Sequence, residues 1–227
     1  MARQQSNEMT TRKPRSYSSL EDFGRVRLSQ HFYMRDFLYS EIGNFFGKPN
    51  IPDDPTLAIL AGEQLCQNLL DPVVNTFGPI AVRSSYRSPD LNHFGATEVK
   101  PQRCSRNEVN YASHIWDRRD SAGRMGACAC IVVPWFADQY ANGRDWRDLA
   151  WWVHDHLPYH AMYFFPKLAA FNLTWREDPA PQIASYAAPK GNLLRAGDTP
   201  SEVRATRQAR YANFPDLGGI TYPPVPS

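Results

Sequence analysis

The stretch that decides the fold runs from Leu65 to Asn92 and reads LCQNLLDPVVNTFGPIAVRSSYRSPDLN. Its first half carries apolar residues at helical spacing, and Gly78-Pro79 ends that pattern. IAVRS then predicts a short strand. The strand is followed by a polar loop that contains Arg87. A helix, a break, a strand and a loop therefore follow one another in a fixed order.

The helix begins upstream of this stretch, in PNIPDDPTLAILAGEQ. Asp53 or Asp54 can cap it, and Pro55 suits its first turn. The apolar stripe comprises Leu57, Leu60, Leu65, Leu69 and Val73. We expect one long helix over residues 55–76.

The chain before the helix begins with a polar segment followed by LSQHFYMRDFLYS. Ser29 can cap a short helix there, with Phe32 and Phe37 turned inward. Residues 92–113, on the other side of the deciding stretch, are polar and predict irregular structure.

The second half of the chain alternates strand and helix signals. ACACIVV predicts a buried strand, residues 135–141 a short helix, and DWRDLAWWVHDHLP a helix capped by Asp145. YHAMYFF, AFNLTWRE and QIASYAA predict three short strands in an antiparallel meander. The order points to an α+β fold, with helices packed on a mainly antiparallel sheet. That sheet should contain residues 79–84, 127–133, 171–176 and 182–187.

Composition limits the class of protein. The 227 residues are 42 % hydrophobic and 13 % aromatic, enough for one globular domain. A formal net charge of +2 gives no reason to expect nucleic acid as a partner. No stretch is long and apolar enough for a membrane span, and no signal peptide is recognisable. These features predict a protein that stays in the cytoplasm or is associated with a phage particle.

We divide the chain into three segments. Residues 1–27 form a polar N-terminal arm, residues 28–190 the folded domain, and residues 191–227 an extended tail rich in Pro and Gly. The two outer segments carry little apolar content. We expect residues 1–20 and 205–227 to lack a core of their own and to become ordered only against a partner.

The deciding stretch and the loop from Ser85 to Asn92 resemble the zinc D-alanyl-D-alanine carboxypeptidases and the phage endolysins of the same family. In that family a long helix feeds a strand that ends in a loop reading roughly S-G-Y-R-S-P-x-x-N. The resemblance extends over about residues 28–187 and implies a Hedgehog/DD-peptidase-like fold. It also implies that the loop arginine, here Arg87, contacts the substrate or its oxyanion. The alternative role for Arg87 is to tie the loop to backbone carbonyl groups.

The family holds its zinc ion with a histidine, an aspartate and a second histidine. His114 stands at the first position, after the irregular segment, as a ligand or as a structural histidine. Cys130 stands where the aspartate belongs, and a thiolate can bind zinc. Asp117 and Asp120, in an inserted segment, are alternatives that we expect on a solvated loop. Asn172 stands at the third position, where an amide is a poor ligand.

Further residues bear on a metal site. The acidic residue that acts as general base in the family is missing, because Leu168-Ala169-Ala170 occupy its neighbourhood. His154, Asp155, His156 and His160 offer a second metal-binding cluster, although a packed helix end explains them more simply. Of the four cysteines, Cys128 and Cys130 share one strand face, as small buried side chains or as metal or redox groups.

Two functions remain open from the sequence. In the first, a DD-peptidase-like domain has lost zinc hydrolysis, holds zinc weakly or not at all, and serves binding or assembly. Its partners would be peptidoglycan peptides or proteins of an assembly such as a phage-like particle. In the second, it is an active zinc peptidase or amidase that cuts the stem peptides of peptidoglycan. The asparagine and the missing base favour the first function.

Overall fold

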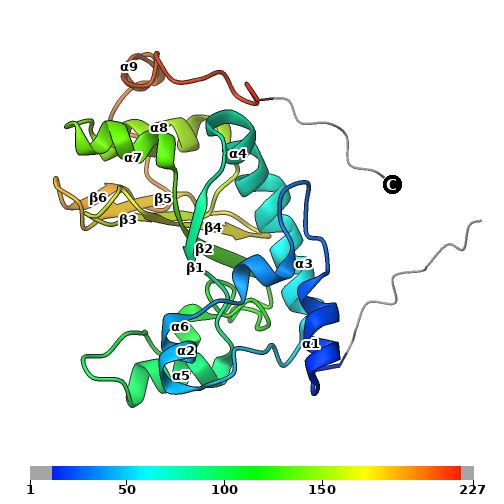
Figure 1. Cartoon of the computed structure of the whole chain (residues 1–227). Coiled ribbons are helices and arrows are strands. Elements are labelled where there is room, and N and C mark those ends of the chain that lie inside the picture. Colours follow the sequence, from blue (N-terminus) through cyan, green and yellow to red (C-terminus); the bar gives the residue numbers. More distant parts are fainter. Residues whose placement is uncertain (1–11, 221–227) are drawn as a thin grey trace, which may run out of the picture.

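The computed structural model describes residues 12–220, which form an α+β fold around a six-stranded, mostly antiparallel open sheet (Figure 1). The strand order is β1-β2-β4-β3-β5-β6. The strands are β1 Ala81–Ser84, β2 Gly126–Val132, β3 Ala161–Phe164, β4 Phe171–Arg176, β5 Gln182–Ser185 and β6 Gly191–Leu194. The four expected strand segments all lie in this sheet. Within residues 12–220 no helix is long and apolar enough to cross a membrane.

The predicted long helix is confirmed. It consists of α3 Pro55–Leu65, a π-helical turn Cys66–Leu70 and α4 Asp71–Phe77. The Asp54 carboxylate caps it by accepting a hydrogen bond from the backbone N–H of Leu57 at 3.0 Å. Gly78 ends it with φ of 84°, a conformation that favours glycine. The helix packs its apolar side against β2 and β4.

Two further helices cover the same face of the sheet, α7 Pro134–Ala141 and α8 Trp146–His156 (Figure 1). Both were expected, and Asp145 caps α8 through the backbone N–H of Arg147. The aromatic side chains Trp146, Trp151, Trp152 and Phe164 are fully buried here. This layer is the main hydrophobic core of the protein.

The last strands do not form the expected antiparallel meander. β3 lies between β4 and β5, antiparallel to β4 and parallel to β5. His160, just before β3, explains the arrangement. Its Nδ1 accepts the backbone N–H of Ala180 at 3.0 Å, and its carbonyl accepts the N–H of Gln182 at 3.1 Å. The short connection after β4 therefore passes over the start of β3 before β5 begins.

The segment after residue 190 is not simply an extended tail. β6 adds to the edge of the sheet, and α9 Arg204–Arg210 packs on α8 (Figure 1). Arg207 pairs with Asp155 at 2.6 Å, and both side chains are at least nine-tenths buried. Phe214 is buried against Phe77. A few well-placed apolar and charged side chains thus attach a segment whose average composition is polar.

The N-terminal segment also contributes to the core. α1 Tyr17–Gly24 buries Phe23 completely, within the segment expected to be an arm. A 3-10 helix, Met34–Phe37, follows, and Phe32 and Phe37 are buried as expected. Ser29 does not cap that helix, because its hydroxyl donates to Asp71 at 2.8 Å. The remaining expectations for the two ends, at residues 1–11 and 221–227, fall outside the described residues.

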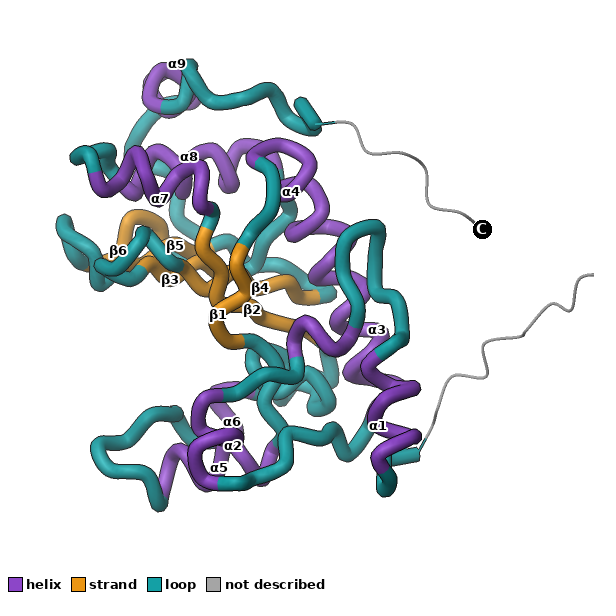
Figure 2. The backbone as a smooth tube through the Cα atoms, in the orientation of Figure 1, coloured by secondary structure: helices purple, strands orange, loops and turns teal. Residues whose placement is uncertain are grey.

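A smaller part of the molecule lies below the sheet and carries α2 Glu41–Phe46, α5 Pro89–Thr97 and α6 Asn107–Asn110 (Figure 2). The prediction of irregular structure over residues 92–113 was wrong at both helices. Ser88 accounts for α5, since its side chain caps the backbone N–H of Leu91 and Pro89 fits the first turn. Long loops join these helices, which face the side of the sheet that α7 and α8 leave uncovered (Figures 1 and 2).

Candidate functional site

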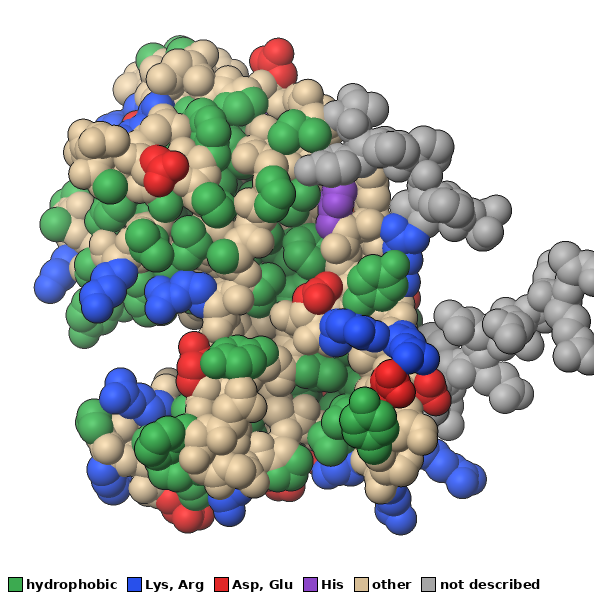
Figure 3. Space-filling model, in the orientation of Figure 1, with side chains coloured by type: hydrophobic (Ala, Val, Ile, Leu, Met, Phe, Trp, Pro, Cys, Tyr) green, Lys and Arg blue, Asp and Glu red, His purple; other side chains and the backbone are tan. Residues whose placement is uncertain are grey.

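A cavity of about 700 Å³ lies between the sheet and the smaller part of the molecule. In Figure 3 the surface is notched between these two parts. A row of neighbouring strand residues forms the sheet side of the cavity. In order across the sheet they are Ser84, Cys130, Asn172 and Tyr163. Residues that are paired across strands project from the same face.

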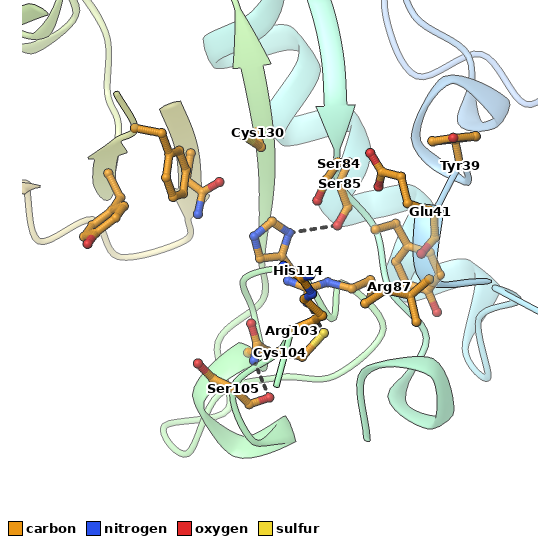
Figure 4. A pocket seen from close by; sticks show the side chains of 17 residues that line it. Tyr39, Glu41, Ser84, Ser85, Arg87, Arg103, Cys104, Ser105, His114 and Cys130 are labelled. Atoms are coloured by element: carbon orange, nitrogen blue, oxygen red, sulfur yellow. Dashed lines mark hydrogen bonds between the residues drawn. The ribbon is translucent and has the colours of Figure 1, made fainter. Parts of the chain in front are cut away.

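The residues singled out from the sequence come together here. Arg87, His114, Cys130 and Asn172 all line this one cavity. Cys130 and Asn172 face each other directly on β2 and β4. His114 and Arg87 enter from the two loops below the strands (Figure 4). Positions far apart in the sequence thus surround one space.

His114 is held rigidly and is neutral. Its Nδ1 donates to the carbonyl of Ser85 at 2.8 Å, which leaves Nε2 without a proton, 3.9 Å from the Sγ of Cys128. Burial, with the nearby charge of Arg87, lowers the pKa of His114 to about 3. The imidazole is therefore uncharged at neutral pH and offers a lone pair.

Arg87 is anchored by its backbone, while its charge is left uncompensated. Its backbone N–H donates to the carbonyl of His114 at 2.8 Å, which joins the two loops. Its Nη1 contacts the Sγ of Cys104 at 2.7 Å, and its Nε is buried without a hydrogen-bond partner. The guanidinium makes no ion pair and no hydrogen bond to a carbonyl among residues 12–220. The side chain of Arg87 therefore does not tie the loop to backbone carbonyl groups.

The two strand thiols near the cavity are protonated at neutral pH. Burial raises the pKa of Cys128 to about 12. Burial also raises the pKa of Cys130 to about 11, with Arg83 opposing the rise and Glu41 adding to it. Metal ligation requires thiolates, so both side chains would have to lose a proton first.

These residues do not fit a hydrolytic zinc site. Such a site needs three protein donors and one open position. Across residues 12–220, no group of three His, Cys, Asp or Glu side chains is placed to hold a metal ion. The strand position opposite Cys130 carries the amide of Asn172. The residues that line the cavity therefore lack the set of donors that a hydrolytic zinc ion needs.

The alternative carboxylates do not reach the cavity. Asp117 is 1 % exposed, so it does not lie on a solvated loop as expected. It accepts the backbone N–H of Asp53 at 2.7 Å, and burial raises its pKa. Asp120 accepts the N–H groups of Ala122 and Arg124 and shapes a turn. Both residues are structural.

The second histidine cluster is also accounted for by packing. His154 Nδ1 lies 2.9 Å from the hydroxyl of Tyr159. His156 Nδ1 lies 2.7 Å from the carbonyl of Trp152, and the two rings stack. Asp155 pairs with Arg207. None of these residues lines the cavity.

Several cavity residues were not recognised from the sequence. They are Tyr39, Glu41, Arg103, Cys104, Tyr163 and Phe165. Arg103 and Cys104 belong to the polar segment between α5 and α6. Tyr39 lies just before the cap of α2, and Glu41 is the first residue of that helix. Only Tyr163 carried a usable signal, because a strand residue paired with Asn172 must share its face.

The comparisons with known proteins do not assign this site. Neither a known protein family, nor a curated protein, nor a solved structure matches this chain.

Proposed function

We propose that this chain is a DD-peptidase-like domain that has lost zinc hydrolysis and uses its cavity to bind peptides with a free C-terminal carboxylate. Stem peptides of peptidoglycan are the ligand class that the motif resemblance suggests. The binding would serve recognition or assembly, for example in a phage-like particle. The order of helix, strand and Arg87 loop, together with the α+β sheet, supports the DD-peptidase-like assignment.

The observation that carries the proposal is the uncompensated guanidinium of Arg87. A guanidinium presents paired N–H donors that match a carboxylate. Arg87 lines the cavity and has no carboxylate partner among the described residues. The bond between its backbone and His114 fixes the position of the loop. A carboxylate bound there would supply the missing counter-charge.

The loss of hydrolysis rests on the donors that are present. Hydrolysis in the family needs a metal-bound water and a carboxylate base. Asn172 replaces the third ligand, and the cavity lining contains a single carboxylate, Glu41, which comes from a different part of the chain. His114, with its lone pair on Nε2, would act as a hydrogen-bond acceptor for a ligand N–H.

Calorimetric titration with Nα,Nε-diacetyl-L-Lys-D-Ala-D-Ala, in the presence of EDTA, tests the proposal. We expect binding of this peptide and binding about tenfold or more weaker for its C-terminal amide, as charged hydrogen bonds contribute about 1.5–3 kcal/mol. Arg87→Gln should remove the difference. Arg106→Ala, an exposed arginine outside the cavity lining, is the matched control and should retain it.

A second assay addresses the competing function. The same peptide is incubated with protein and added zinc, and released D-alanine is measured. We expect no release above the rate without protein. Zinc-dependent release that disappears in His114→Ala would establish the active peptidase instead. No binding of either peptide would overturn the proposed binding function.

A further inference from the structure

Glu41 is an acidic group that the proposed function leaves unused. It is an exposed residue in the first turn of α2, and its side chain projects from that helix toward Ser84 and Ser85 (Figure 4). It is the one carboxylate among the described residues that line the cavity. No cation within the described residues forms an ion pair with it. An acidic side chain facing the cavity is therefore available to a ligand.

The position of Glu41 is fixed by the packing of its helix. Ser40 caps α2 by accepting the backbone N–H of Gly43 at 3.2 Å. Gly43 lies against α5, where an added Cβ would meet the carbonyl of Lys48 at 3.0 Å and Leu91 at 3.4 Å. Phe46 contacts Phe94 of α5 with ring centroids 5.2 Å apart. The short helix is thus held on the smaller part of the molecule, and its first turn faces the cavity.

Among the described residues, the positively charged side chains that line the cavity do not pair with its one carboxylate. Its two lining cations are Arg87 and Arg103, and neither approaches Glu41 closely enough for an ion pair. In Figure 4 both arginines lie below His114, whereas Glu41 enters from the side of α2. Arg103 is exposed, and its guanidinium has no hydrogen-bond partner among residues 12–220. A ligand with a single charge would pair either with the arginines or with Glu41 and would leave the other group without a partner.

We infer that the cavity recognises ligands that carry a protonated amine in addition to their carboxylate, and that Glu41 binds this amine. The inference rests on the proposed function, because Arg87 is the group that receives the carboxylate. In a stem peptide the amine is the free side-chain amine of a diamino acid. Glu41 then selects among peptides that share the same carboxylate end.

Two peptides that differ only in this amine provide the test. Nα-acetyl-L-Lys-D-Ala-D-Ala has a free ε-amine, and Nα,Nε-diacetyl-L-Lys-D-Ala-D-Ala does not. We expect the free amine to tighten binding about three- to fivefold at low salt, as an ion pair in a solvent-accessible site does. The ratio of the two Kd values should fall toward one in 0.5 M KCl, because salt screens the pair.

Substitution of the carboxylate completes the experiment. Glu41→Gln should bring the ratio of the two Kd values to about one. Glu108→Gln, in the same part of the molecule but outside the cavity lining, should keep the wild-type ratio. Thermal unfolding of both variants checks their folding. A loss of folding alone would not change the ratio, since it lowers the active concentration for both peptides equally.

The outcomes separate the two proposals. Equal affinity of wild-type protein for the two peptides would overturn the role of Glu41 and leave the binding function in place. The same holds for a preference that persists in Glu41→Gln. Failure of both peptides to bind would overturn both proposals.

Discussion

The two faces of one sheet differ in what their side chains do. On β2, Ala127, Ala129 and Ile131 belong to the main core beneath the helices, whereas Cys128 and Cys130 face the other way. On β4, Phe171 and Leu173 join the same core, while Asn172 lies in the cavity lining. Successive residues of one strand therefore have different roles: one packs in the core and stabilises the fold, and the next faces the cavity. Substitutions one position apart should separate the two roles.

The largest effect on stability is expected for a substitution on the face of the sheet that the helices cover. Phe164 is fully buried and stacks on Phe171 with ring centroids 4.6 Å apart. Phe164→Ala should lower the free energy of unfolding by about 3–5 kcal/mol, through lost burial and the cavity left behind. Tyr163→Ala, on the cavity side, should cost about 1 kcal/mol. Urea unfolding followed by tryptophan fluorescence measures both, and equal losses would contradict the division of roles.

The next effect concerns the cavity side and zinc. Because Cys130 and Asn172 are directly paired and His114 lines the same cavity, Cys130→Asp combined with Asn172→His would supply the three donors of a hydrolytic zinc site. We expect zinc to bind roughly a hundredfold tighter than in the wild-type protein, equal to about 3 kcal/mol. Equilibrium dialysis with elemental analysis measures it. His114→Ala in the double variant should abolish the gain; if zinc stays bound, the ligands are elsewhere.

The third prediction concerns how the free energy of unfolding depends on pH. The pKa of His114 is lowered to about 3 in the fold, against about 6.5 when unfolded, so the unfolded chain binds the extra proton between these values. The stability that depends on the neutral form of His114 is present above the unfolded pKa of about 6.5 and is lost as the pH falls toward 3. The loss between pH 7 and pH 5 should be about 2 kcal/mol from this residue. Urea unfolding of His114→Gln should show a flatter pH profile, and parallel profiles would disprove the assignment.

The smallest effect sharpens the comparison within β2. Cys130 is 9 % exposed at the cavity, so the hydroxyl of Cys130→Ser can find water and should cost about 1 kcal/mol or less. Ala129 is 0 % exposed in the apolar core. Ala129→Ser buries a hydroxyl among apolar groups there and should cost about 1–3 kcal/mol. Melting temperatures show which of the two variants is less stable. If Cys130→Ser lost more stability than Ala129→Ser, the two faces of β2 would be assigned wrongly.

The sequence predicted most elements because local signals agree with one another. The helix over residues 55–76, its acidic cap and its glycine end are local features, and the structure has all three. The sequence could not predict the place of β5, which depends on hydrogen bonds that His160 accepts from the backbone N–H groups of Ala180 and Gln182, far along the chain. It also failed after residue 190, because Arg207 and Phe214 are stabilised by distant partners that an average composition cannot show.

The same division holds for the candidate site. The resemblance to a family pattern singled out Arg87, His114, Cys130 and Asn172, and these four residues line one cavity. Glu41 and Arg103 carry no motif and reach the cavity only because α2 and the loop after α5 fold beneath the sheet. Local spacing fixes which face of a strand a side chain occupies. The approach of a second, distant part of the chain to that face is decided by tertiary packing, since it depends on contacts between segments that are remote in sequence.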